Sequence, residues 1–106
     1  MAQYTDEELE REIQAKGKTA PRVTAQQIDD KIIAVHHHRF PNTTLTVCAI
    51  ELENGYLVVG HSASASPENF DREIGEKLAY DHARSQIWQL EGYLLREKQF
   101  QGVDSL

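Results

Sequence analysis

The chain has 106 residues, of which 40% are hydrophobic, and a formal net charge of −6. This length fits one domain with a modest core, and the acidic charge excludes the many Lys and Arg contacts to phosphates on which DNA or RNA binding depends. A single cysteine excludes an intramolecular disulfide, and no apolar run approaches the roughly 20 residues that span a bilayer, so we expect a soluble cytoplasmic protein with no membrane partner.

The N-terminal segment predicts an acidic helix and then a linker. Thr5–Glu8 has the spacing of a capping box, in which a hydroxyl and a carboxylate bind two unpaired backbone N–H groups, so we expect a helix over residues 6–16. Only Leu9 and Ile13 give this helix an apolar stripe, which indicates a loosely docked or partner-dependent segment. The glycine and proline of residues 16–21 indicate a linker.

A second helix is predicted next in the chain. Thr24–Gln27 repeats the capping pattern, so we expect a helix of about a dozen residues. Its apolar positions recur at helical spacing, at Ile28, Ile32 and Val35. Pro41 disfavours helix for the residue before it and ends the element. His36–His38 then lie at a helix end, where neighbouring side chains diverge by about 100° and cannot share one ion, so we expect a solvated terminus and no metal site.

Two apolar runs joined by Asn54-Gly55 predict a β-hairpin, because Asn-Gly supplies the positive φ values of a type I′ turn. With this pair as a two-residue loop, Leu52 faces Leu57 and Cys48 faces His61. The register predicts a core face made of Leu52, Leu57, Ile50, Val59 and Cys48. It also predicts a second face that a partner could cover, made of Val47, Ala49, Glu51, Val58 and Tyr56.

The expected pairing of Cys48 with His61 raises the question of a nucleophilic Cys-His pair. The same strands offer no Asn or Asp beside them to orient the histidine, and a buried cysteine commonly packs as a small hydrophobic residue. We therefore favour core packing for Cys48.

A long C-terminal helix is predicted to begin at Pro67. Ser66 is a good N-cap, proline is favoured at the first helical position, and Glu68 complements the helix dipole. Apolar residues then recur at helical spacing, at Phe70, Ile74, Leu78, Ile87, Leu90, Leu94 and Leu95. We expect helix to about Lys98, with Gly92 as the point where it could break.

These elements predict an α+β fold, in which an antiparallel β-hairpin packs on the long C-terminal helix and on a shorter preceding helix. We expect residues 1–20 to form an N-terminal acidic helix and linker, and residues 21–106 to form a single α+β domain. Because two strands alone do not make a stable sheet, we expect a homodimer that extends the sheet across two copies.

The serine-rich stretch before the long helix has two interpretations. A helix N-terminus carries unpaired N–H groups and a partial positive charge, which together can bind phosphate. The polar side chains that could add to such a site are Ser62, Ser64, Ser66 and Asn69. A plain helix cap explains the same residues, and Glu68 and Asp71 would repel an anion unless they point away. Chemistry alone favours the cap and leaves the anion site open.

No catalytic motif occurs in the sequence. It has no GxxxxGK phosphate loop, no GxGxxG turn and no HExxH helix, and Asp71, Asp81 and His82 have no acid-base or metal-ligand spacing. We therefore expect a protein that is not an enzyme and uses no cofactor.

From Arg22 to about Lys98 the sequence resembles a family of small, mostly uncharacterised proteins of tailed phages and prophages. The stretches that carry the resemblance are Arg22–Thr24, Leu45–Cys48, Asn54–Tyr56, Val59–Ala63, Ser66–Asp71, Glu73–Gly75 and Ile87–Leu95. Their combination is specific, although each stretch alone is weak. The family is similar to the type-one Thoeris anti-defence proteins, phage sponges that bind cyclic ADP-ribose signals, in some cases also cyclic oligonucleotides, and assemble as dimers or trimers of dimers.

The resemblance implies a phage or prophage accessory protein that sequesters a small anionic nucleotide in the cytoplasm of an infected or lysogenic bacterium. It implies ligand contacts at Tyr56, which could stack on adenine, and at Asn69, with the pyrophosphate near Ser66. The cations expected to assist, from the same or a neighbouring subunit, are Arg22, Arg72 and Arg84. Tyr56 stands where the family pattern has Phe, and His61 stands where it has an acid, which removes a negative charge beside the phosphate.

The competing hypothesis is a phage structural or protein-interaction module with no small-molecule ligand. In that case the serine-rich stretch only caps a helix. Titration with cyclic ADP-ribose isomers and cyclic dinucleotides separates the two hypotheses.

Overall fold

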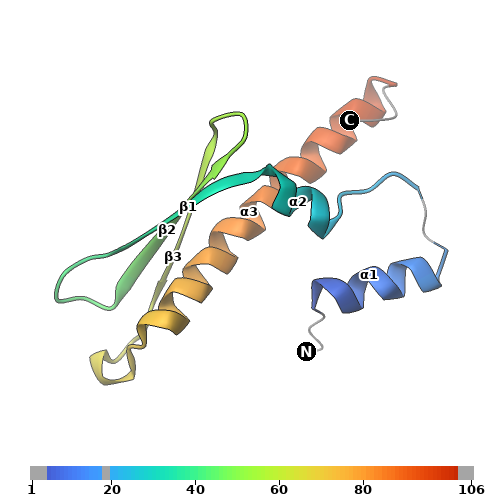
Figure 1. Cartoon of the computed structure of the whole chain (residues 1–106). Helices are drawn as coiled ribbons and strands as arrows, with labels where there is room; N and C mark the ends of the chain where they lie inside the picture. The colour runs from blue at the N-terminus through green and yellow to red at the C-terminus, as the bar shows by residue number, and fades with distance from the viewer. Residues whose placement is uncertain (1–4, 18–19, 103–106) are drawn as a thin grey trace.

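A computed structural model describes residues 5–17 and 20–102 of the chain. The elements in these residues are α1 (Asp6–Ala15), α2 (Ala25–Lys31), β1 (Ile32–Arg39), β2 (Leu45–Leu52), β3 (Leu57–Ala63), the 3-10 helix η1 (Pro67–Asn69) and α3 (Arg72–Phe100). The antiparallel sheet has the order β1-β2-β3, and α3 lies across one face of it, against β2 and β3 (Figure 1). The predicted α+β fold is confirmed, with a third strand. None of the helices described is long and apolar enough to cross a membrane.

The core lies between α3 and the inner face of the sheet. Its buried apolar residues are Ile28, Cys48, Ile50, Leu52, Val58, Ala79, Ala83 and Ile87. The alanines let α3 approach Gly60 on β3 so closely that a Cβ atom there would lie 2.3 Å from the backbone nitrogen of Ala83. Helix and sheet are therefore joined by close backbone packing as well as by large side chains.

The second helix is shorter than predicted, and a strand replaces its second half. Its capping box is present, but α2 ends at Lys31 and β1 begins at Ile32. The β-branched residues from Ile32 to Val35 favour a strand, and β1 pairs with β2 so that Val35 faces Ile50. The predicted dozen-residue helix is wrong, because a short apolar run fits either period and only the pairing with β2 decides between them.

The β2–β3 hairpin forms as predicted, but its loop has three residues instead of two. Gly55 has a φ of 89°, whereas Asn54 does not take the positive φ that a type I′ turn requires. The Leu52 N–H donates to the Tyr56 carbonyl (2.9 Å), and the Gly55 N–H donates to the Leu52 carbonyl (2.8 Å). The loop is thus closed by Leu52 and Tyr56, and the predicted register is wrong by one residue.

This shift inverts the two faces of β3 and leaves those of β2 as predicted. The residues of β2 on the predicted core face are buried, namely Cys48, Ile50 and Leu52. On β3, Val58 is buried instead of its neighbours, and Leu57 and Val59 are 55% and 51% exposed. The outer face of the sheet therefore carries apolar side chains that the described residues do not cover.

The long helix begins five residues later than predicted. Pro67–Asn69 forms a separate 3-10 turn, Phe70 and Asp71 are extended, and α3 starts at Arg72. It then runs unbroken through Gly92.

The apolar stripe predicted for α3 is only partly buried. Ile87 lies in the core, whereas Ile74 and Leu78 are 59% and 53% exposed. The buried face instead carries Ala79 and Ala83, because the close approach to the sheet leaves no room there for larger side chains.

Candidate functional site

The serine-rich joint lies between the end of β3 and the start of α3. The N-cap of α3 is Asp71, whose carboxylate accepts a hydrogen bond from the Ile74 N–H (3.0 Å). Ser66, the predicted N-cap, makes no side-chain cap bond. The predicted cap is wrong, because the helix starts elsewhere, and the positive end of α3 is already complemented by a carboxylate.

Two serines of the joint are bound to nearby backbone carbonyls. The Ser62 hydroxyl donates to the Gly75 carbonyl (2.6 Å), and the Ser64 hydroxyl donates to the Ser66 carbonyl (3.2 Å). The Thr44 hydroxyl in turn donates to the Ser64 carbonyl (2.8 Å). Because each serine hydroxyl has a single proton, these side chains brace the joint, and an anion there depends on other donors.

Two arginines lie at this end of the molecule. Arg72, a predicted site residue, is exposed, and its Nε lies 3.3 Å from a carboxylate oxygen of Glu76. Arg39, which the sequence did not single out, lies with its guanidinium carbon 4.2 Å from the centre of the Phe70 ring, and its Nε donates to the Thr43 carbonyl (3.1 Å). Sequence reasoning missed Arg39 because it predicted a helix for this segment, whereas Arg39 is the last residue of β1.

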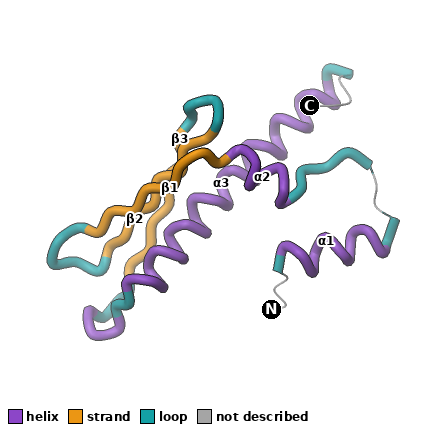
Figure 2. The backbone as a smooth tube through the Cα atoms, in the orientation of Figure 1, coloured by secondary structure: helices purple, strands orange, loops and turns teal. Residues whose placement is uncertain are grey.

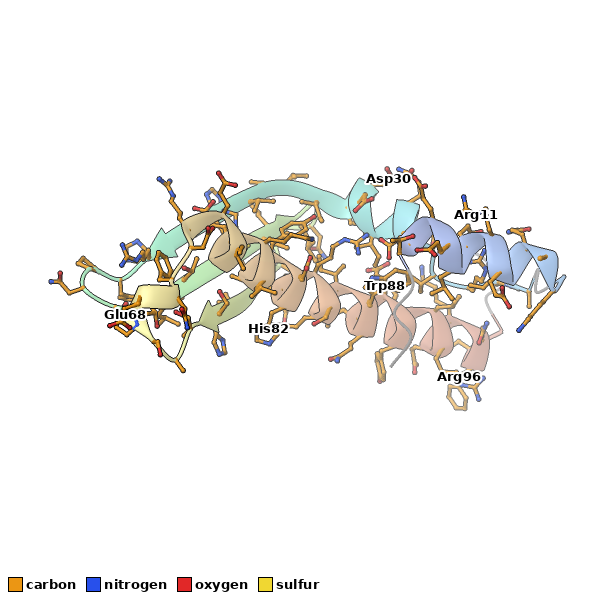
Figure 3. The ribbon with its side chains drawn as sticks, turned by 90° about the horizontal axis from the view of Figure 1, so that it is seen from below. Arg11, Asp30, Glu68, His82, Trp88 and Arg96 are labelled. Carbon is orange, nitrogen blue, oxygen red and sulfur yellow. The ribbon has the colours of Figure 1, made fainter. Side chains whose placement is uncertain are left out.

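Asn69 is exposed on the 3-10 turn of the same joint. Its neighbour Glu68 lies toward one end of the molecule in Figure 3, far from Trp88 in the middle of α3. The head of α3 thus brings together Asn69, Arg72, Arg39 and Phe70.

Tyr56 lies at the other end of the sheet. It follows the β2–β3 loop, whereas the joint follows the seven residues of β3, which extend about 3.3 Å each and span on the order of 20 Å. Figure 2 shows this loop and the joint at opposite ends of the sheet. Tyr56 is 55% exposed, and one copy of the chain does not bring it near Asn69.

Arg22 and Arg84 lie apart from the joint and are paired with carboxylates. Arg84 Nη2 lies 3.0 Å from Asp6 Oδ2 and 3.1 Å from Asp29 Oδ1. Arg22 donates to the carboxylate of Glu10, and this hydrogen bond lowers the pKa of Glu10. In this structure α1 and α2 therefore hold both guanidinium groups.

The cysteine and the histidine triplet have other surroundings than the sequence predicts. Cys48 is fully buried and faces Gly60, and burial raises the pKa of its thiol. The predicted pairing with His61 is wrong, and core packing of Cys48 is confirmed.

His36–His38 lie exposed on β1, where successive side chains alternate between the two faces, and not at a helix end. Among residues 5–17 and 20–102, no group of three or more His, Cys, Asp or Glu side chains is placed to hold a metal ion.

Side chains of α3 cover the outer edge of β3. The His61 N–H donates to His82 Nδ1 (3.0 Å), and the Gln86 amide donates to the Val59 carbonyl. His82, labelled in Figure 3, thus has a structural contact and does not lie on a purely solvated face.

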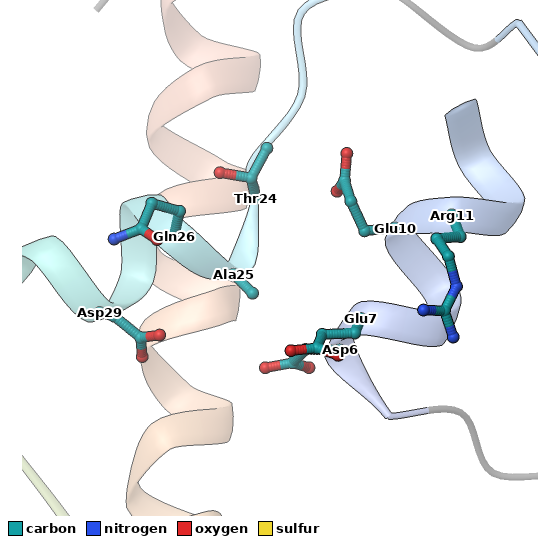
Figure 4. Close-up of a pocket in the computed structure, with 8 residues that line it drawn as sticks. All are labelled: Asp6, Glu7, Glu10, Arg11, Thr24, Ala25, Gln26 and Asp29. Carbon is teal, nitrogen blue, oxygen red and sulfur yellow. The ribbon is translucent and has the colours of Figure 1, made fainter.

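An open cleft of about 740 Å³ lies between α1 and α2 (Figure 4). Its charged lining consists of Asp6, Glu7, Glu10, Asp29 and Arg11. Four carboxylates against one guanidinium do not suit a phosphate. This cleft is therefore a poor site for an anionic nucleotide.

The fold and these sites define a small α+β protein, in which one long helix packs on a three-stranded antiparallel sheet and cationic and amide side chains lie around the start of this helix. The chain belongs to the phage protein family described as N4 Gp49/phage Sf6 gene 66, which matches residues 23–99. The match includes α2, the whole sheet and nearly all of α3, and it leaves α1 outside. Comparison with curated proteins and with solved structures gives no match.

Proposed function

We propose that this phage protein binds and sequesters a small anionic nucleotide, of the cyclic ADP-ribose type or a cyclic oligonucleotide, without converting it chemically. It would do so in the cytoplasm of an infected or lysogenic bacterium. Membership in the phage family supports the phage setting, and the side chains at the head of α3 support an anionic ligand.

The observation that carries the proposal is the position of Arg39 beside the head of α3. Its guanidinium lies over Phe70, directly after the 3-10 turn that holds Asn69, and Arg72 begins the helix at the same end. A planar guanidinium binds phosphate through two parallel hydrogen bonds, and an amide can both donate to and accept from a base or a ribose. Because Asp71 already caps α3, we assign anion binding to these side chains and not to the helix terminus.

Tyr56 completes the site only if it comes from a second copy. We propose a homodimer, alone or within a trimer of dimers, in which two copies lie with their strands reversed. Tyr56 lies opposite the buried Leu52 and Arg39 lies opposite the buried Thr46, so both side chains are on the α3 side of the sheet. Reversal brings the Tyr56 end of one copy to the Asn69 end of the other, where the ring can stack on a base.

Isothermal titration of cyclic ADP-ribose isomers and cyclic dinucleotides into the full chain tests the proposal. We expect saturable binding, weakened about tenfold or more by Asn69→Ala and by Tyr56→Ala, which remove the amide contact and the stacking surface. Gln89→Ala, an exposed amide further along α3, is the matched control and should bind as the native chain does.

The outcomes of this titration are distinct. No heat of binding with any of these ligands would refute sequestration, and full affinity in both variants would place the site elsewhere. Because we propose binding without chemical conversion, we expect the ligand to be recovered intact after heat denaturation of the complex. A hydrolysed ligand would contradict this part of the proposal.

A protein-interaction module is the second candidate, and the exposed apolar outer face of the sheet favours it. Val59 lies on this face on the edge strand β3, opposite Ala49 of the central strand β2. This candidate predicts no nucleotide binding and a stable complex with a different protein that Val59→Lys abolishes. Sequestration predicts instead nucleotide binding that Tyr56→Ala weakens.

A further inference from the structure

Charged contacts connect α1 to the rest of the chain. All ten residues of α1 are described, and none of them is buried. Asp6 and Glu10, one helical turn apart, reach Arg84 and Arg22 on the other side of the interface. Leu9 and Ile13, also one turn apart, line a small pocket of about 80 Å³ together with Trp88. The helix thus presents two carboxylates and two apolar side chains to one surface.

The surface beneath α1 is built without it. Arg84 is also held by Asp29 of α2, at 3.1 Å. Trp88 packs against the core. When α1 leaves, the guanidinium of Arg84 and the ring of Trp88 therefore keep their places. Preorganisation of this kind lowers the cost of binding a replacement helix.

The contacts of α1 are weak enough to exchange. An ion pair between partly exposed side chains contributes about 0–1 kcal/mol, and a helix of this length is marginal in water without tertiary packing. The nine residues from Lys16 to Thr24 can span at most about 30 Å, which allows α1 to reach a neighbouring molecule. Exchange of an identical element between copies keeps every contact and adds none that is new.

We propose that Arg22, Arg84 and Trp88 form a binding site for an acidic amphipathic helix, filled by α1 of the same chain, and that α1 of a second copy occupies it when two copies associate. The occupant is chosen by complementarity, because each copy carries the matching pairs of carboxylates and apolar residues. This site is separate from the nucleotide site and does not depend on it.

A peptide in solution tests the site in the full chain. The Asp6→Asn/Glu10→Gln chain weakens the intramolecular contact, and Trp88, the single tryptophan, reports binding by fluorescence. A peptide of residues 5–17 lacks aromatic residues and should change the Trp88 emission in a saturable manner, weakened severalfold by 0.5 M salt. The same peptide with both substitutions should bind about tenfold more weakly.

The outcomes decide between a specific site and a nonspecific one. Arg22→Gln and Arg84→Gln, added together to the double variant, should abolish the difference between the two peptides. If both peptides change the Trp88 emission of the Asp6→Asn/Glu10→Gln chain equally, the proposal is overturned. It is also overturned if 1 mM of the native peptide leaves this emission unchanged.

Cross-linking tests exchange between copies. Glu7 and Gln26 line the cleft between α1 and α2, make none of the ion pairs to Arg22 or Arg84, and lie on opposite sides of the cleft (Figure 4). A mixture of Glu7→Cys and Gln26→Cys chains, treated with a short bis-maleimide, should give severalfold more linked dimer than a mixture of Glu7→Cys with Lys77→Cys. Equal yields would show that α1 stays on its own chain and would overturn the exchange.

Discussion

At the scale of single residues, Gly60 determines how closely the long helix lies on the sheet. A Cβ atom at this position would lie 2.3 Å from the Ala83 nitrogen and 2.5 Å from the Ala79 carbonyl oxygen, both of them backbone atoms of α3. Backbone atoms within a helix cannot turn aside as a flexible side chain can. The position therefore requires glycine because of space, since its φ is not positive.

We predict that Gly60→Ala lowers the free energy of unfolding by about 1–3 kcal/mol, because the methyl group must push α3 away from β3. Gly92→Ala is the matched control, since a Cβ atom there meets nothing within 4 Å and alanine favours the helix by about 0.5–1 kcal/mol. Urea unfolding followed by circular dichroism measures both. A Gly60→Ala chain as stable as the native one would mean that this contact is not tight.

At the scale of elements, the two capping boxes and the existence of the hairpin were predictable, whereas the N-cap of α3, the strand β1 and the hairpin register were not. The capping boxes of α1 and α2 form as predicted, because they depend on residues three apart. The boundary between α2 and β1 was missed, because the strand is stabilised by hydrogen bonds to β2, which no local pattern contains. The hairpin register was missed because Gly55 alone, without Asn54, takes positive φ.

The residues of the candidate site also differ in whether a local stretch of sequence identifies them. Asn69 and Arg72 could be singled out from a recognisable stretch of sequence, and both lie at the head of α3. Arg39 could not, because its place beside Phe70 depends on the fold of the sheet and the joint. Whether Asn69 binds a ligand stays a prediction.

Protonation of Glu10 should release α1. The hydrogen bond from Arg22, assisted by one from Gln14, lowers the pKa of Glu10 below the 4.5 of an unperturbed glutamate. A lowered pKa means that docking favours the ionised form, so its contribution is complete above about pH 4.5 and is lost as the pH falls through the pKa of the docked state.

We therefore expect the Trp88 emission and the hydrogen exchange of α1 to change below pH 4.5 in the native chain. In the Glu10→Gln chain the exchange of α1 should already be fast at neutral pH. That chain keeps Glu8, whose pKa is lowered by the backbone and hydroxyl of Thr5, so the difference between the two chains isolates Glu10. The same pH profile in both chains would contradict an ion pair that holds α1 in place.

At the scale of the whole molecule, the long helix and sheet separate the two parts of the proposed nucleotide site. The β2–β3 loop, which Tyr56 follows, lies at one end of the sheet, and the joint before α3, which holds Asn69, lies at the other, beyond the length of β3 (Figure 1). A monomer therefore presents two incomplete halves. A two-fold dimer with reversed sheets would have two complete sites, each made of Tyr56 from one copy and Asn69 from the other.

Mixing the Tyr56→Ala and Asn69→Ala chains tests this shared site most directly. Random pairing from an unfolded mixture makes about half of the dimers mixed, and each mixed dimer has one intact site out of two. We predict that titration with the ligand that the native protein binds recovers about a quarter of the sites at native affinity. A mixture that binds no better than the two variants measured separately would contradict the account.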